Sequence, residues 1–255
     1  MPILSPDQIQ FYRSHGYLIV DSLLTNAELQ LYQADAQLLT NHCLEQGDIV
    51  TDWGCIVEPL ACNYYDDDQL TNLHKATRAD YLALRHSTTN GVALCTLDKF
   101  GLCARQLLHH QDTRETVFLL NEQYIAKPPR STEAQFAWHQ DILYMSETER
   151  QHAIVSVWTP LCDVGSDNGT VMVEPFPDPN NPGVYADKCQ GAFTVVMDAG
   201  SALFMDGRLR HCSGGNHSES FRLVFMPQFS LGPIERTNHS NAALAIPLGP
   251  TIEYT

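Results

Sequence analysis

Two stretches of the sequence decide the fold: Trp138-His139-Gln140-Asp141 and, far downstream, His211-Cys212-Ser213-Gly214-Gly215-Asn216-His217-Ser218. They offer two imidazoles and a carboxylate, the ligand set that holds non-haem Fe(II) on one face and leaves other positions open. Alternate residues of a strand point to the same side, so His139 and Asp141 can reach one ion while Gln140 points elsewhere. The third ligand has to approach from another wall, and we therefore expect His211 on a facing strand.

A lone cation follows the second stretch. Arg222 lies eleven residues after His211, inside the apolar run Phe221–Pro227, which predicts a buried strand. Burying a guanidinium without a partner is costly. Its partner is either one of the protein's many acids or the carboxylate of a ligand, because arginine presents a planar fork suited to carboxylates. A 2-oxo dicarboxylate would chelate iron through its keto-acid end and give its far carboxylate to Arg222.

These motifs resemble the phytanoyl-CoA dioxygenase family of Fe(II)- and 2-oxoglutarate-dependent oxygenases. The similarity runs from about Asp7 to Ser230. It rests on His139-Gln140-Asp141, His211-x-Ser213-x-x-Asn216-x-Ser218, Arg222, Lys127-Pro128-Pro129, Val157-Trp158-Thr159-Pro160-Leu161, Asp167-Asn168-Gly169 and the opening Phe11–Val20.

The resemblance implies roles for individual residues. The iron ligands and catalytic residues would be His139, Asp141 and His211, and the cosubstrate contacts would be Arg222, Ser213, Trp158, Gln123 and Lys127. His217 is the rival of His211, but it precedes Arg222 by only five residues. Trp158 would equally suit a core strand, and Lys127, next to two prolines, would equally suit the surface.

The implied reaction uses Fe(II), 2-oxoglutarate and O2 to oxidise an unactivated C–H bond of a small metabolite or natural-product intermediate, releasing succinate and CO2. Hydroxylation is the expected outcome, with desaturation, cyclisation or dealkylation as variants, and the carboxylate of Asp141 argues against halogenation. Relatives often carry Gly-Ser-His after the Asn-Gly turn, whereas this chain has Val171–Pro177. Acyl-CoA substrates are disfavoured because their phosphates call for a basic patch.

Two other functions fit the same barrel. A cupin-like isomerase or hydrolase could use the histidine and aspartate set with zinc or manganese, but it would not need Arg222 at this offset. A non-enzymatic binding protein would be expected to have lost a ligand, and every required position is filled.

Composition restricts the partners. The 255 residues include 30 acidic against 15 basic side chains, a net charge of −15 that disfavours nucleic acids and anionic membranes. Eight cysteines without a C-x-x-C pair argue against a zinc ribbon or a disulfide framework. No secretory signal or long apolar run is visible. We expect a cytoplasmic protein, a monomer or homodimer, that acts on a small molecule.

The order of the elements predicts a mainly β fold with flanking helices. Capping boxes at Ser5 and Thr25 predict helices to about Ser14 and Glu45, with a strand at Tyr17–Val20 between them. Further helices are expected over 70–86 and 96–110, and long loops over 47–68 and 174–189. Strands are expected over 116–126, 136–141, 152–160, 170–174, 192–197, 202–205 and 221–229.

Strands of this length and spacing suggest a double-stranded β-helix, the jelly-roll or cupin-like architecture. We expect one domain over 1–255. Its parts would be a helical amino-terminal region at about 5–112, a jelly-roll core at about 113–230 and a tail at 231–255.

Overall fold

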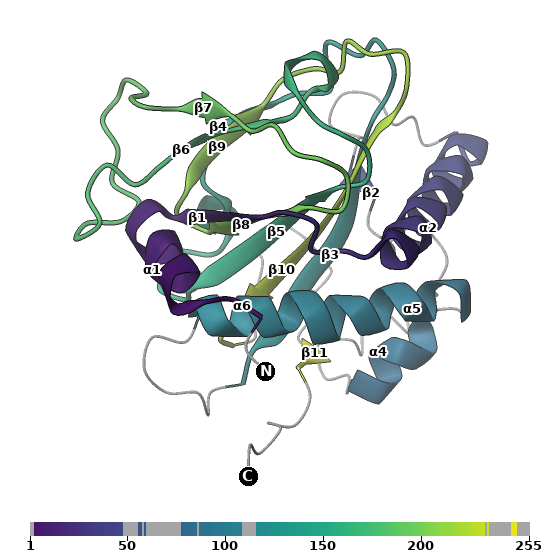
Figure 1. Ribbon diagram of the computed structural model, residues 1–255, viewed down its shortest axis with the longest axis horizontal. Helices are drawn as coiled ribbons and strands as arrows, with labels where there is room; N and C mark the ends of the chain where they lie inside the picture. Colours follow the sequence, from purple (N-terminus) through teal and green to yellow (C-terminus); the bar gives the residue numbers. More distant parts are fainter. Residues whose placement is uncertain are drawn as a thin grey trace.

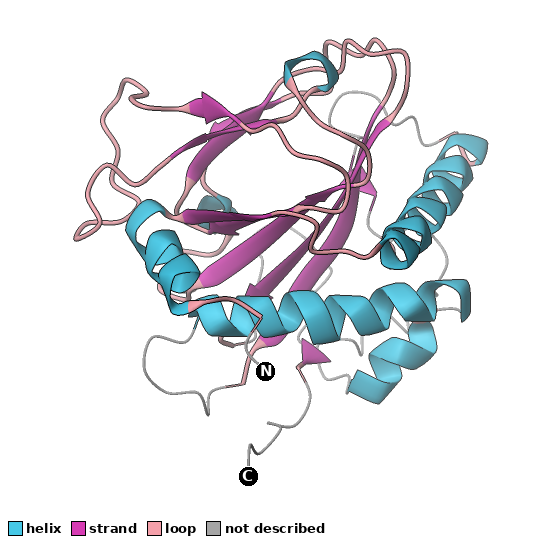
Figure 2. Cartoon of the chain, viewed as in Figure 1, coloured by secondary structure: helices cyan, strands magenta, loops and turns pink. Residues whose placement is uncertain are grey.

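Two antiparallel sheets face each other in the computed structural model, which describes residues 3–47, 56–57, 59, 78–85, 87–108, 116–232, 234 and 246–248 (Figures 1 and 2). The larger sheet has the order β1-β8-β5-β10-β3-β11, with β2 also paired to β3, and the smaller has the order β4-β9-β6-β7. This arrangement confirms the predicted mainly β jelly roll.

The strands of the larger sheet are β1 (Tyr17–Val20), β2 (Ile56–Val57), β3 (Phe118–Lys127), β5 (Ile154–Pro160), β8 (Ala202–Asp206), β10 (Arg222–Ser230) and β11 (Ile246–Pro247). Those of the smaller sheet are β4 (Phe136–His139), β6 (Val171–Glu174), β7 (Phe193–Thr194) and β9 (Arg210–Ser213). Three strands of the larger sheet, β1, β2 and β11, come from outside the span 113–230 that we expected to form the core.

Helices cover the side of the larger sheet that faces away from the smaller one (Figure 1). They are α1 (Pro6–His15), α2 (Asn26–Glu45), α4 (Arg78–Leu84), α5 (Ser87–Cys95), the π-helical turn η3 (Thr96–Phe100) and α6 (Gly101–Leu108); two short 3-10 turns, η4 (Asp141–Tyr144) and η5 (Ser166–Asn168), lie among the strands. No described helix has the length and apolarity to cross a membrane.

The first two helices begin as the sequence predicts. The Ser5 hydroxyl accepts from the backbone of Gln8, whose side chain accepts from the backbone of Ser5 in return. Thr25 and Glu28 form the same reciprocal cap at the start of α2. Gly16 ends α1 at a φ of 78°, a left-handed conformation that costs a glycine little.

The helix predicted over 96–110 begins earlier, at Ser87, and is one rod in which η3 joins α5 to α6. Gly91, inside α5, serves close packing of this rod. A Cβ added at Gly91 would lie 3.0 Å from Cδ1 of Leu31, so the missing side chain lets α5 approach α2. The prediction for the start of this helix was therefore wrong.

Other boundaries also differ. The strand predicted over 192–197 is limited to β7, and Met197 instead forms an isolated bridge with Val164. Of the helix predicted over 70–86, α4 is the described part, and residues 70–77 lie outside the described ranges. Residues 109–115 and most of the predicted loop 47–68 also lie outside the described ranges. Within that loop, the short strand β2 is described and pairs with β3.

A buried ionic cluster joins the helices to the back of β3. Nη2 of Arg85 lies 2.9 Å from Oδ2 of Asp35, and its Nε lies 3.3 Å from Oε1 of Glu122. The Tyr124 hydroxyl also donates to Asp35. Burial raises the pKa of Glu122, although Arg85 opposes the shift. Because side chains alternate along a strand, this cluster fixes β3 from the helix side while Gln123 faces the opposite side.

Replacing Arg85 with methionine should lower the free energy of unfolding by about 3–5 kcal/mol, because Asp35 would stay buried without its cation. Urea denaturation followed by circular dichroism measures the change. Arg130→Met is the matched control: the Arg130–Glu219 pair is 73% and 72% exposed, and such surface pairs contribute about 0–1 kcal/mol. If Arg85→Met lowered the free energy of unfolding as little as the control does, the buried cluster would not stabilise the fold.

Candidate metal centre

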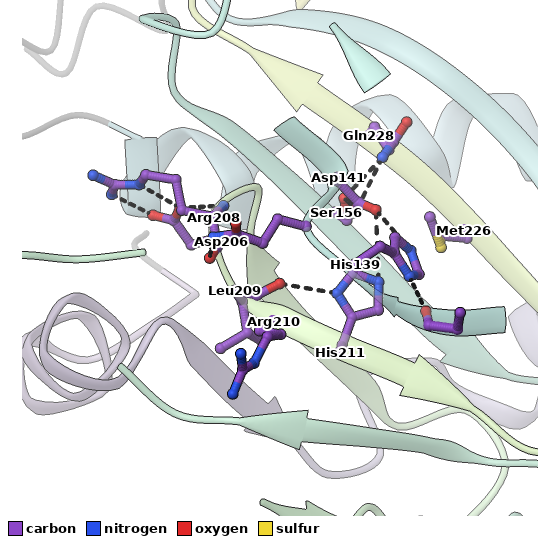
Figure 3. Close-up of polar contacts among 12 residues, drawn as sticks. His139, Asp141, Ser156, Asp206, Arg208, Leu209, Arg210, His211, Met226 and Gln228 are labelled. Carbon is purple, nitrogen blue, oxygen red and sulfur yellow. Dashed lines mark hydrogen bonds and ion pairs between the residues drawn. The ribbon is translucent and has the colours of Figure 1, made fainter. Parts of the chain in front are cut away.

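Three side chains from separate elements meet between the two sheets (Figure 3). His139 is the last residue of β4, Asp141 opens η4, and His211 lies in β9 directly opposite His139. Nε2 of each imidazole is 3.6 Å from Oδ1 of Asp141, and the three potential ligand atoms lie within 4.8 Å of one another. The intervening Gln140 points away and donates to the backbone carbonyls of Gly183 and Arg208.

Backbone carbonyls orient both imidazoles. Nδ1 of His139 lies 2.7 Å from the carbonyl oxygen of Ala137, and Nδ1 of His211 lies 3.0 Å from that of Leu209. A carbonyl can only accept, so each neutral ring carries its proton on Nδ1 and turns the lone pair of Nε2 towards Asp141. This is the tautomer that a metal-binding histidine requires.

The charges of the cluster suit a cation. Burial by itself would raise the pKa of Asp141, but the neighbouring His211, and then His139 and Ser156, hold that pKa well below its ordinary value. Burial lowers the pKa of His211 although Asp141 opposes it. At neutral pH the site therefore offers an ionised carboxylate beside a neutral imidazole. Two nitrogen donors and one oxygen donor fit a non-haem iron ion.

The cluster opens into a cavity of about 410 Å³ that both sheets line. Four of the five predicted cosubstrate contacts lie in its wall: Gln123, Trp158, Ser213 and Arg222. The fifth, Lys127, is fully buried behind that wall and not at the surface. Its ammonium donates to the Ser213 hydroxyl at 2.7 Å and to the carbonyl of Gly214.

Arg222 occupies the first position of β10, opposite Lys127 of β3. It is 1% exposed, and its guanidinium carbon lies 5.6 Å from the centre of the Trp158 ring. Arg222, Trp158 and Ser213 all line the same cavity. The rival histidine, His217, is exposed and is not part of the cluster.

Three polar residues near Asp141 escaped the sequence analysis as site residues. Ser156 and Gln228 both donate to Asp141, and Asn121 donates to Gln228. Ser156 interrupts the apolar run Ile154–Trp158, Gln228 interrupts the run Val224–Phe229, and Asn121 begins the polar stretch Asn121–Gln123 within β3. Such an interruption of a buried run is the signal that could have pointed to them.

The sequence of this chain is similar to a known protein family. The model of the family described as Phytanoyl-CoA dioxygenase (PhyH) matches residues 12–224. The peroxisomal phytanoyl-CoA dioxygenase of Bos taurus is 22% identical over 253 residues, which cover 89% of this chain and 69% of the bovine protein.

Solved structures share the fold at low identity. SnoN, a non-heme alpha-ketoglutarate-dependent epimerase from nogalamycin biosynthesis, is 17% identical with a TM-score of 0.64 over 96% of this chain and 98% of its own. SnoN has also been solved in complex with Fe3+, alpha-ketoglutarate and nogalamycin RO, at a TM-score of 0.62. SnoK, a carbocyclase from the same biosynthesis, is 16% identical with a TM-score of 0.64 over 98% of this chain and 95% of its own.

Proposed function

Because this chain belongs to the phytanoyl-CoA dioxygenase family, we propose that it is an Fe(II)- and 2-oxoglutarate-dependent oxygenase that uses O2 to oxidise a C–H bond of a small, neutral molecule. The observation that carries the proposal is the meeting of His139, Asp141 and His211 in one cavity with a buried arginine in its wall. The alternative cupin-like isomerase would have no use for that arginine.

His139, Asp141 and His211 would hold the iron, each through the atom that the fold already turns inward. With 2-oxoglutarate and O2 present, bound iron supplies an oxidant strong enough to take hydrogen from an unactivated carbon, while the cosubstrate leaves as succinate and CO2. The protein contributes by fixing the ligands, excluding water and holding the target carbon close.

Arg222 would bind the far carboxylate of 2-oxoglutarate through its planar fork. The Ser213 hydroxyl, which accepts from Lys127, is left with its own proton to donate to the same carboxylate. The buried ammonium of Lys127 adds positive charge behind this end of the cavity. Trp158 holds the guanidinium from one side, and Gln123 offers a carboxamide from the neighbouring strand.

The rest of the cavity wall favours an uncharged substrate. Apart from the three metal-centre residues and Arg222, the described lining side chains are neutral. The apolar and aromatic ones are Ile56, Ile125, Phe136, Leu143, Tyr144, Met145, Trp158, Val171, Met205 and Met226. A substrate charge placed here would lose its hydration without gaining a partner. The cavity volume is within the range of sites that bind small molecules. For the reaction itself, the outcome that we propose is hydroxylation.

Anaerobic addition of Fe(II) and then 2-oxoglutarate to the purified protein tests the proposal. A weak visible charge-transfer band should appear only when both are present, and admission of oxygen should produce succinate and CO2 in equal amounts. A protein that gives neither the band nor succinate, yet turns over a substrate with zinc or manganese in the absence of oxygen, would instead be the isomerase or hydrolase.

A further inference from the structure

One rung of the larger sheet is polar where its neighbours are largely apolar. Asn121 of β3 lies opposite Gln228 of β10, and Gln228 lies opposite Ser156 of β5. Directly opposed residues of antiparallel strands point to the same face, so the three side chains form a row across three strands on the cavity side. All three are buried, and buried polar side chains require hydrogen-bond partners.

The row forms a directed chain of hydrogen bonds that ends on Asp141, and Figure 3 shows its part from Gln228 and Ser156 to Asp141. Nδ2 of Asn121 donates to Oε1 of Gln228 at 3.4 Å, and Nε2 of Gln228 donates to the Ser156 hydroxyl at 2.9 Å. Ser156 and Gln228 then donate to Oδ2 of Asp141 at 2.5 and 3.2 Å. An ionised carboxylate only accepts, so the NH2 group of Gln228 must face it, and the orientation of this amide is fixed by chemistry.

The two oxygens of Asp141 therefore have different surroundings. Oδ1 faces both imidazoles, each with Nε2 at 3.6 Å. Oδ2 is turned towards the sheet and already takes two neutral donors. Two donors occupy both lone pairs of Oδ2, so a carboxylate that bound an ion through both oxygens would have to give up at least one of these hydrogen bonds.

We propose that Ser156 and Gln228 are positioning residues that reserve Oδ2 of Asp141, so that this side chain binds metal through Oδ1 alone. The inference rests on the proposed metal site and adds how its carboxylate is held. Binding through a single oxygen leaves more of the coordination sphere open, which a site that must also admit a chelating cosubstrate and O2 requires.

Binding of Co(II) to the purified apoprotein, without cosubstrate and without oxygen, is the test. Ser156→Ala and Gln228→Met should each weaken Co(II) binding by roughly 10- to 100-fold, the usual effect of removing a group that orients a metal ligand. The visible absorption of bound Co(II) should also change, because the carboxylate can rotate. The fold-loss of Co(II) affinity in the double variant should be smaller than the product of the fold-losses in the two single variants, because both side chains hold the same oxygen.

Ser230→Ala is the matched control. Ser230 is fully buried on the same strand as Gln228, but its hydroxyl donates to the carbonyl of Gly232 at 2.7 Å. This variant should keep the wild-type Co(II) affinity and spectrum. The melting temperature of each apoprotein identifies the folded variants, and two substitutions on different strands keep the test open if one of them fails to fold.

Wild-type Co(II) affinity in a folded Ser156→Ala or Gln228→Met protein would overturn the inference, and so would an equal loss in Ser230→Ala. Failure of the wild-type protein itself to bind Co(II) is a different result. It would refute the proposed metal site, and this inference with it.

Discussion

Replacing Asp141 with alanine should abolish succinate formation and weaken Fe(II) binding by more than about 100-fold. Groups that merely orient a metal ligand contribute roughly 10- to 100-fold, and a direct ligand should exceed that range. The variant also removes the negative charge that balances a divalent cation between His139 and His211. Anaerobic Fe(II) titration and a succinate assay measure the two effects.

Asp141→Asn separates charge from shape, because it keeps the size of the side chain but not the anion. It should lose nearly as much affinity as the alanine variant. Asp178→Ala removes an exposed carboxylate from the long loop and should behave as wild type. An Asp141→Ala protein that keeps the full rate would remove Asp141 from the metal shell.

Replacing Arg222 with alanine should raise the 2-oxoglutarate concentration needed for half-maximal turnover while Fe(II) binding stays unchanged. Removing one member of a buried charged pair typically costs about 2–5 kcal/mol, which corresponds to roughly 30-fold to several thousand-fold in affinity. Titration of the anaerobic Fe(II) protein with 2-oxoglutarate, followed by the charge-transfer band, gives the affinity directly.

Arg222→Lys sharpens this experiment. Lysine keeps the charge but not the planar fork, so its affinity for 2-oxoglutarate should lie between wild type and the alanine variant. Arg130→Ala, at an exposed arginine, should leave the affinity unchanged. Wild-type affinity in Arg222→Ala would mean that the guanidinium holds no part of the cosubstrate.

The sequence predicted best where a local pattern has one physical solution. The capping boxes at Ser5 and Thr25 satisfy backbone groups within four residues, so they depend on nothing distant. The H-x-D spacing predicted that His139 and Asp141 could reach one ion, and the resemblance to the family, with the offset of eleven residues to Arg222, selected His211 over His217; the structure brings the three side chains together. Their roles as iron ligands stay predictions until a metal is measured.

The failures involve contacts that no local pattern contains. The helix that begins at Ser87 was predicted to begin too late, and the close packing of its Gly91 against Leu31 involves a second helix. Lys127 looked equally suited to the surface, and its burial depends on Ser213 in the opposite sheet. Ser156 and Gln228 meet only because β5 and β10 pair in one register, which the assembled sheet decides.

The position of β10 in the sheet has a consequence for folding during synthesis on the ribosome. This strand lies at the centre of the larger sheet, between β5 and β3, although both neighbours precede it in the chain. A ribosome delivers β3 and β5 long before the strand that joins them, so they emerge with unpaired edges that invite aggregation. The centre of the larger sheet, and the site that it lines, cannot form until β10, which ends at Ser230, has left the ribosome. Nascent chains of this protein should therefore depend on chaperones up to that point.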